Sequence, residues 1–187
     1  MIDRRYFIGV LGAGLASAAV PRLAQATVIR GLSLEQLARE SERILLGTAL
    51  EATSHWAMIG GRRRIVTDTR WRVEDAIAKA RPQDSEVMIR TLGGRVGDVG
   101  AIVHGEAELA LEESCVVFLR ALPDGVHRVT GMAQGHYPLR ADAERIVRLQ
   151  PSPRSNEVLS HEHTALRRLV GRRLPEARDL IRGALAR

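Results

Sequence analysis

The stretch "ILLGTALEATSHWAMIGGRRRIVTDTRWRVEDAIA", residues 44–78, decides the fold. Two long runs of β-forming residues flank "IGGR" (59–62), a glycine-containing pattern typical of a tight turn. In the second run, mostly polar residues alternate with a set that shares one face of a strand: Ile65, Thr67, Thr69, Trp71 and Val73. Gly47 in the first run marks a bend or a β-bulge. The stretch therefore predicts a long, bent antiparallel hairpin.

A short helix is predicted immediately before this hairpin. Ser33 is followed three residues later by Gln36, which is the pattern of a capping box. Leu34, Leu37 and Ala38 share one helical face. We expect the helix to end near Ser41.

Further strands are predicted after the hairpin. "VMIRTLGG" (87–94) and "SCVVFLRAL" (114–122) read as the third and fourth strands. "PDG" (123–125) is predicted to form a hairpin turn before a fifth strand, "VHRVTGMA" (126–133). Two further short strands are predicted at "GHYPLR" and "RIVRLQ". The predicted fold class is mainly β, an antiparallel OB-like barrel with a short N-terminal helix and a C-terminal helix or helix pair.

The C-terminal part of the chain is predicted to be helical. "PSPRSN" (151–156) is typical of a linker, and Pro175 is placed at a helix start. Leu180, Ile181 and Leu185 lie on one face of that helix. We expect three segments: an export signal (1–26), a β-barrel domain (27–150), and a linker with a helical segment (151–187).

The N-terminal segment has the order of an export signal. Arg4 and Arg5 precede an apolar run, and Ala24 and Ala26 occupy the −3 and −1 positions of a cleavage site. Paired arginines before Phe7-Ile8 resemble the twin-arginine signal, and the alternative is the basic region of a general secretory signal. We expect cleavage near residue 27 and a periplasmic or secreted protein. The apolar run is too short for a membrane span, so no stable span is expected after cleavage, and the twin-arginine export machinery is the expected partner in transit.

Composition gives little support for nucleic-acid binding. The chain has 28 basic and 22 acidic residues, and Lys79 is its one lysine. The clusters "GRRRIV" (61–66) and "RRLVGRR" (167–173) are interpreted as solvated surface, because aromatic residues for stacking on bases make up only 3% of the chain. The single cysteine, Cys115, excludes an internal disulfide and is interpreted as a core residue.

The run from "DTRWRVEDAI" through "GGRVGDVG", "VVFL" and "GMAQG" resembles a domain found in uncharacterised exported bacterial proteins. In that family a strand precedes a "GG-x-V-G-x-x-G" loop, a "VVFL" strand and a "G-x-x-Q-G" turn. The resemblance covers about Leu34 to Leu139 and implies an OB-like barrel, related to netrin and tissue-inhibitor modules, but no activity. The sequence departs from animal tissue inhibitors because it has no N-terminal cysteine to chelate a protease metal.

Two glycine-containing stretches are candidate binding sites. The excursion 93–106 carries Arg95, Asp98, His104 and Glu106, and the turn 133–137 carries His136 and Tyr137. Loops on a rigid scaffold are common places for binding groups. The alternative is that both stretches are turns that close the barrel, with Tyr137 packed inside.

No catalytic motif is present. The sequence contains neither a G-x-S-x-G elbow nor H-E-x-x-H, and the 93–100 glycines do not match a phosphate-binding loop. We therefore predict an exported non-enzymatic binding module for an unknown extracytoplasmic protein or ligand, without a cofactor. Two alternatives remain: a metal-dependent hydrolase using His161 and His163, and a modulator of a secreted protease.

Overall fold

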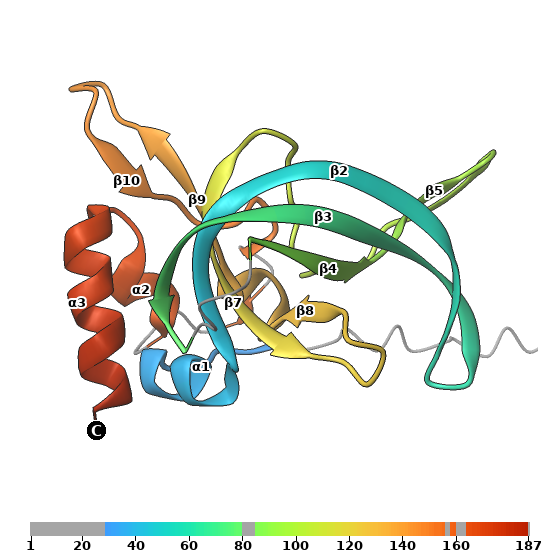
Figure 1. Cartoon of the computed structure of the whole chain (residues 1–187), viewed down its shortest axis with the longest axis horizontal. Helices are drawn as coiled ribbons and strands as arrows, with labels where there is room; N and C mark the ends of the chain where they lie inside the picture. The colour runs from blue at the N-terminus through green and yellow to red at the C-terminus, as the bar shows by residue number, and fades with distance from the viewer. Residues whose placement is uncertain (1–28, 80–84, 156–157, 160–163, 187) are drawn as a thin grey trace, which may run out of the picture.

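The computed structural model describes residues 29–79, 85–155, 158–159 and 164–186. Arg4, Arg5, Ala24 and Ala26, which belong to the predicted export signal, lie outside these ranges. Over the described residues the protein is mainly β, with one large mixed sheet and three α-helices that gather at one end of it (Figure 1). No helix in the described ranges is both long enough and apolar enough to cross a bilayer.

The predicted hairpin is confirmed. Strands β2 (Arg43–Ile59) and β3 (Arg62–Ala78) have 17 residues each and pair antiparallel from end to end. Gly60 and Gly61 form the turn between them, both with positive φ, as a two-residue turn of type I′ requires. The pairing register shifts between Leu46 and Gly47, so the predicted bulge is also present.

Gly47 is required at the bulge because the neighbouring chain lies against its backbone. A Cβ atom at this position would be 2.0 Å from the carbonyl oxygen of Arg72 and 2.7 Å from the indole ring of Trp71. The bend of β2 and the burial of Trp71, which is 0% exposed, therefore depend on the same glycine.

The other strands of the large sheet flank this hairpin. The order is β10-β9-β7-β2-β3-β4-β8. Strand β8 also pairs antiparallel with β7, and it meets β4 in parallel through one residue pair, Ile89 and His127. The remaining strands of this sheet have the following bounds: β4 Glu86–Leu92, β7 Ser114–Ala121, β8 His127–Val129, β9 His136–Ala141 and β10 Val147–Leu149.

Smaller elements complete the chain. Strands β5 (Gly94–Val96) and β6 (Val99–Ala101) form a hairpin, and β1 (Ile29–Arg30) pairs in parallel with β11 (Val158–Leu159). A short 3-10 helix, η1 (Met132–Gly135), leads into β9.

The helices begin and end where the sequence predicts. Helix α1 (Leu34–Glu40) has the complete capping box between Ser33 and Gln36. The C-terminal segment forms a pair, α2 (Ala165–Leu169) and α3 (Leu174–Leu185), and Pro175 lies in the first turn of α3. The Nζ of Lys79 donates to the carbonyl oxygens of Ala38 and Ser41 at 2.9 Å, so the one lysine of the chain satisfies acceptors at the end of α1.

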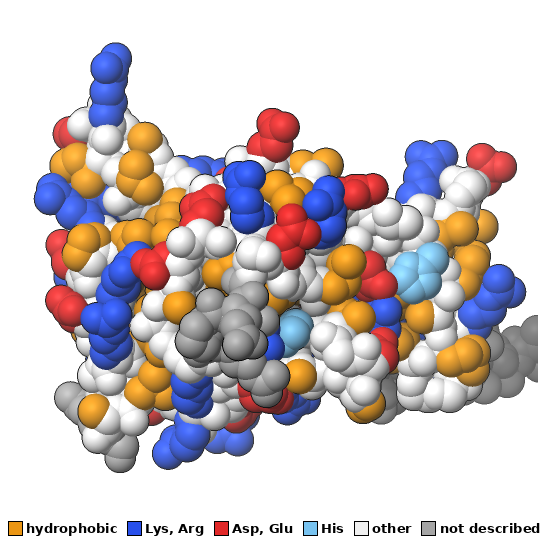
Figure 2. All heavy atoms as spheres, in the orientation of Figure 1, with side chains coloured by type: hydrophobic (Ala, Val, Ile, Leu, Met, Phe, Trp, Pro, Cys, Tyr) orange, Lys and Arg blue, Asp and Glu red, His pale blue; other side chains and the backbone are white. Residues whose placement is uncertain are grey.

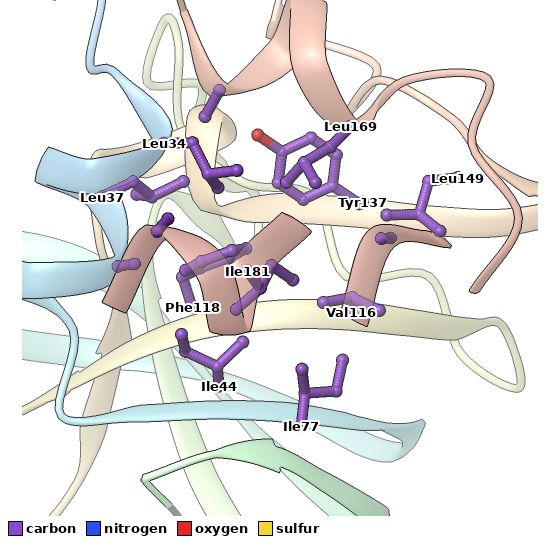
Figure 3. Close-up of a cluster of buried hydrophobic side chains, with 14 of the residues drawn as sticks. Leu34, Leu37, Ile44, Ile77, Val116, Phe118, Tyr137, Leu149, Leu169 and Ile181 are labelled. Carbon is purple, nitrogen blue, oxygen red and sulfur yellow. The ribbon is translucent and has the colours of Figure 1, made fainter. Parts of the chain in front are cut away.

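The sheet is covered on both faces, which explains why β2 and β7 read as nearly continuous apolar runs. Alternate residues enter two cores. The first lies between the sheet and the helices and contains Phe118, Tyr137 and Ile181 (Figure 3). The second lies on the inner face of the curved sheet and contains Leu45, Trp71 and Val117.

Candidate functional site

The glycine-rich excursion begins at a pair of glycines attached to β3. Gly93 and Gly94 have φ values of 99° and 124°, a region that L-residues rarely adopt. The amide of Gly93 donates to the carbonyl oxygen of Ile65 at 2.9 Å, and the hydroxyl of Thr67 donates to the carbonyl oxygen of Gly93 at 2.8 Å. A Cβ on Gly94 would lie 2.3 Å from the Thr67 hydroxyl oxygen, so the chain reverses here only with glycine.

After Gly93 and Gly94, the excursion forms an open pocket of about 470 Å³ against the inner face of the sheet. The floor of the pocket carries hydroxyl groups, because Thr67 and Thr69 of β3 and Thr91 of β4 point to the face that also holds Trp71 and Ile89. The roof is apolar and comes from the excursion. Its principal side chains are Ala101, Ile102, Val103, Ala107 and Leu109. The result is an amphipathic pocket of ordinary size for a small ligand.

Glu106 is the buried acid of this pocket. Its side chain is almost fully enclosed, and its two carboxylate oxygens accept from the amides of Leu92 at 3.3 Å and Ala107 at 3.1 Å. Burial raises the pKa of Glu106, and these two amide hydrogen bonds oppose that rise. Among the described residues no ion pair within 4 Å is formed by Glu106, so a donor or a cation on a ligand would stabilise its charged form.

A second acid and an arginine lie at the rim. Arg154 Nε is 3.3 Å from Glu108 Oε2, and its Nη1 donates to the carbonyl oxygen of Val103 at 3.4 Å. Arg154 comes from the segment after β10, so the pocket joins parts of the chain that are about fifty residues apart.

Three of the predicted binding residues lie near the pocket but do not line it. Arg95 and Asp98 are exposed on the β5–β6 hairpin, where Arg95 Nε donates to the carbonyl oxygen of Gly97 at 3.1 Å. His104 is exposed on the excursion between Val103 and Gly105.

The other two predicted residues are buried. Tyr137 is 0% exposed and packs edge-on against Phe118 with ring centroids 5.9 Å apart. His136 is also buried, and its Nδ1 lies 3.0 Å from Ser152 Oγ. Burial, with a smaller contribution from Arg140, lowers the pKa of His136 to about 4, so the ring is neutral at pH 7. The turn that carries them meets the excursion through one backbone hydrogen bond, from the Ala133 amide to the Gly105 carbonyl oxygen at 2.9 Å.

The remaining candidates for chemistry do not form a site in the described residues. His161 and His163 lie outside the described ranges, and within those ranges no group of three or more His, Cys, Asp or Glu side chains could hold a metal ion. Cys115 is buried, and burial raises the pKa of its thiol to about 12. A thiol that stays protonated and covered is a packing residue.

The sequence signal for the pocket was incomplete. Glu106 lay within the predicted excursion, but nothing in its neighbours marks it as buried. Thr67 and Thr69 were placed on one face of their strand, and Arg154 carries no local signal at all. The alternation of residues identified the face of the strand, but the roof over that face depends on packing.

Comparison of the chain with protein-family models gives no match, and comparison with curated proteins gives none either.

Proposed function

We propose that the protein is an exported, non-enzymatic binding module built on an OB-like barrel. The support for the barrel is the pattern of pairing, in which β7, β2, β3, β4 and β8 are linked in a ring and β8 pairs with both β7 and β4. Four of the five contacts in the ring are antiparallel, and the β4–β8 contact is parallel. Such a ring is the arrangement of a small, partly open Greek-key barrel.

The observation that carries the binding proposal is the position of the pocket. In OB folds, ligands bind at the second and third strands of the barrel and at the loops beside them. Strands β3 and β4 hold the corresponding places in this ring, and their threonines form the floor of the pocket. A ligand at this place would contact the hydroxyl floor, the apolar roof and the carboxyl group of Glu106.

The lining favours binding over catalysis. Glu106 is the buried titratable residue among the lining side chains, while Glu108 and Arg154 are paired at the rim. General acid–base catalysis commonly needs a second positioned group with a suitable pKa. One buried carboxyl among hydroxyls and aliphatic side chains is suited to recognise a small ligand that carries hydrogen-bond donors, such as an amine or a polyol.

The export part of the proposal is supported by the N-terminal sequence and is tested by cell fractionation. Mature protein lacking residues 1–26 is expected in the periplasm or the medium. Replacement of Arg4-Arg5 by Lys-Lys is expected to block export by the twin-arginine route. Full-length protein in the cytosol of unmodified cells would contradict export, and unchanged export of the Lys-Lys variant would favour the general secretory route.

The binding part is tested with two glutamates that lie two residues apart. Purified protein is incubated with the small-molecule fraction of a cell-envelope extract, and retained compounds are identified by mass spectrometry. Glu106→Gln replaces the carboxyl group by an amide of similar shape and is expected to abolish retention. Glu108→Gln, the exposed control, is expected to retain the same compounds. Equal retention by both variants would contradict the pocket as the binding site.

A further inference from the structure

The end of the long hairpin forms a surface that is separate from the pocket. The hairpin tip, residues 56–65, extends beyond the rest of the large sheet. Pairing of β2 with β7 stops at Thr48, and pairing of β3 with β4 stops at Val66, so the tip is a two-stranded ribbon. In Figure 1 the ribbon curves away from the helices toward the opposite end of the molecule.

The hairpin tip is strongly basic. Arg62, Arg63 and Arg64 are consecutive and exposed, and the sequence has no acidic residue between Glu51 and Asp68. None of the three arginines is within ion-pair distance of an acid in the described part of the chain. The three positive charges are therefore not neutralised within the described protein.

The tip also exposes large apolar side chains, which are costly to leave in water. Met58 is 67% exposed and Trp56 is 38% exposed, whereas the other tryptophan, Trp71, is fully buried. The guanidinium carbon of Arg63 lies 4.7 Å from the centre of the Trp56 ring, so the cationic and aromatic groups form one surface. Basic and hydrophobic side chains lie next to each other over this end of the molecule in Figure 2.

We propose that the hairpin tip docks the protein on an anionic lipid bilayer. Tryptophan is favoured at the boundary between headgroups and acyl chains, and arginine binds lipid phosphates while its stem remains in contact with apolar atoms. A negatively charged leaflet attracts clustered arginines over about one Debye length. The narrow ribbon presents these groups at one end, so Trp56 and Met58 enter the interface while the sheet and the pocket stay in water.

This docking is independent of the ligand in the pocket. The floor and roof of the pocket are built from residues outside the hairpin tip, and Glu106 is not part of it. A failed pocket experiment would leave the docking proposal standing, and a failed docking experiment would leave the pocket proposal standing.

The test is sedimentation of the mature protein with vesicles in 0.1 M salt. Vesicles of equal parts phosphatidylcholine and phosphatidylglycerol are expected to bind it, and vesicles of phosphatidylcholine alone are expected to bind far more weakly. Replacing Arg62, Arg63 and Arg64 together by Gln is expected to weaken binding about 100-fold, since each arginine near an anionic surface contributes about fivefold.

A matched control comes from the second basic cluster. Arg167, Arg172 and Arg173 are exposed at the helical end of the molecule, and their replacement by Gln removes the same net charge. This control is expected to lose much less affinity than the tip variant. Equal losses in the two triple variants would overturn the proposal, because binding would then follow net charge alone.

Fluorescence distinguishes insertion from simple attraction. Binding to the anionic vesicles is expected to shift the emission of Trp56 to shorter wavelength, and the shift is expected to be absent in Trp56→Phe. Binding without this shift would overturn the proposed geometry.

Equally tight, arginine-dependent binding of single-stranded oligothymidylate would assign the surface to nucleic acid instead. The melting temperature of each variant is expected to match that of the parent, because the tip lies outside both cores.

Discussion

Acidification is expected to destabilise the protein through His136. The ring is enclosed between β9 and the segment after β10, where Ser152 meets its Nδ1. Its Nε2 is buried with no hydrogen-bond partner among the described residues. A second proton would therefore place a charge in a dry environment, with Arg140 as the nearby cation that also opposes it. This is the physical cause of the low pKa.

The magnitude follows from linkage. The pKa of His136 falls from 6.5 in the unfolded chain to about 4 in the folded protein, so the unfolded chain takes up the proton first as the pH falls. The stabilising effect of the neutral ring is complete above pH 6.5 and is lost between pH 6.5 and pH 4. At 1.36 kcal/mol per pKa unit, the loss is about 2 kcal/mol at pH 5 and about 3 kcal/mol at pH 4.

The assay is urea unfolding at several pH values between 7 and 4, with His136→Gln as the reference. The carboxylates titrate in both proteins, so the difference between their free energies of unfolding gives the contribution of the histidine alone. The parent is expected to be the more stable protein at pH 7, and its advantage over the variant is expected to shrink by about 3 kcal/mol at pH 4. Parallel stability curves for the two proteins would refute a buried neutral ring.

Three further substitutions or reactions test the packing. Gly47→Ala is expected to lower the free energy of unfolding by about 3 kcal/mol, because the new methyl group overlaps the Arg72 carbonyl oxygen. Its control, Gly183→Ala on the open side of α3, is expected to raise stability by about 0.5–1 kcal/mol, and the reverse order would contradict the contact at the bulge. Lys79→Met is expected to cost about 1–2 kcal/mol by thermal unfolding, since the carbonyl groups at the end of α1 lose their charged donor, and an unchanged melting temperature would argue against the cap. Cys115 is expected to resist a thiol reagent at pH 8 until denaturant is added, and rapid labelling of native protein would contradict its burial.

Local patterns were sufficient for the long hairpin, the main strands and the helices, but not for the short strand pairs β5–β6 and β1–β11 or for η1, which occupies the end of the predicted fifth strand. The capping box at Ser33, the turn glycines at residues 60–61, the bulge at Gly47 and the proline that starts α3 each act within a few residues. Their effects do not depend on the rest of the fold, because they fix backbone angles or satisfy nearby amides. Pattern analysis therefore placed the hairpin, the main strands and the helices.

The candidate binding residues were harder to predict, because exposure depends on distant segments. A histidine and a tyrosine after a glycine turn have the chemistry of a binding site, but the helices cover Tyr137 and the segment after β10 covers His136. Glu106 has an ordinary local sequence, and it is buried because its excursion folds back over β3 and β4. Local polarity therefore did not reveal that the two side chains of the turn are covered, and it placed Glu106 among the polar residues of the excursion without showing that this acid is buried.

The sequence by itself determined where the chain turns, bends, and starts or ends its helices, and it determined which residues share a strand face. The tertiary structure decided which of those faces became the floor of a pocket and which became a core. The reason is that β2 and β7 are covered on both faces, so an apolar run of residues does not reveal which layer each side chain enters. The pocket depends on contacts between residues that are far apart in the sequence. Thr67 and Gly93 are 26 positions apart, and Val103 and Arg154 are 51 positions apart. Contacts at that separation form only when the whole sheet has folded.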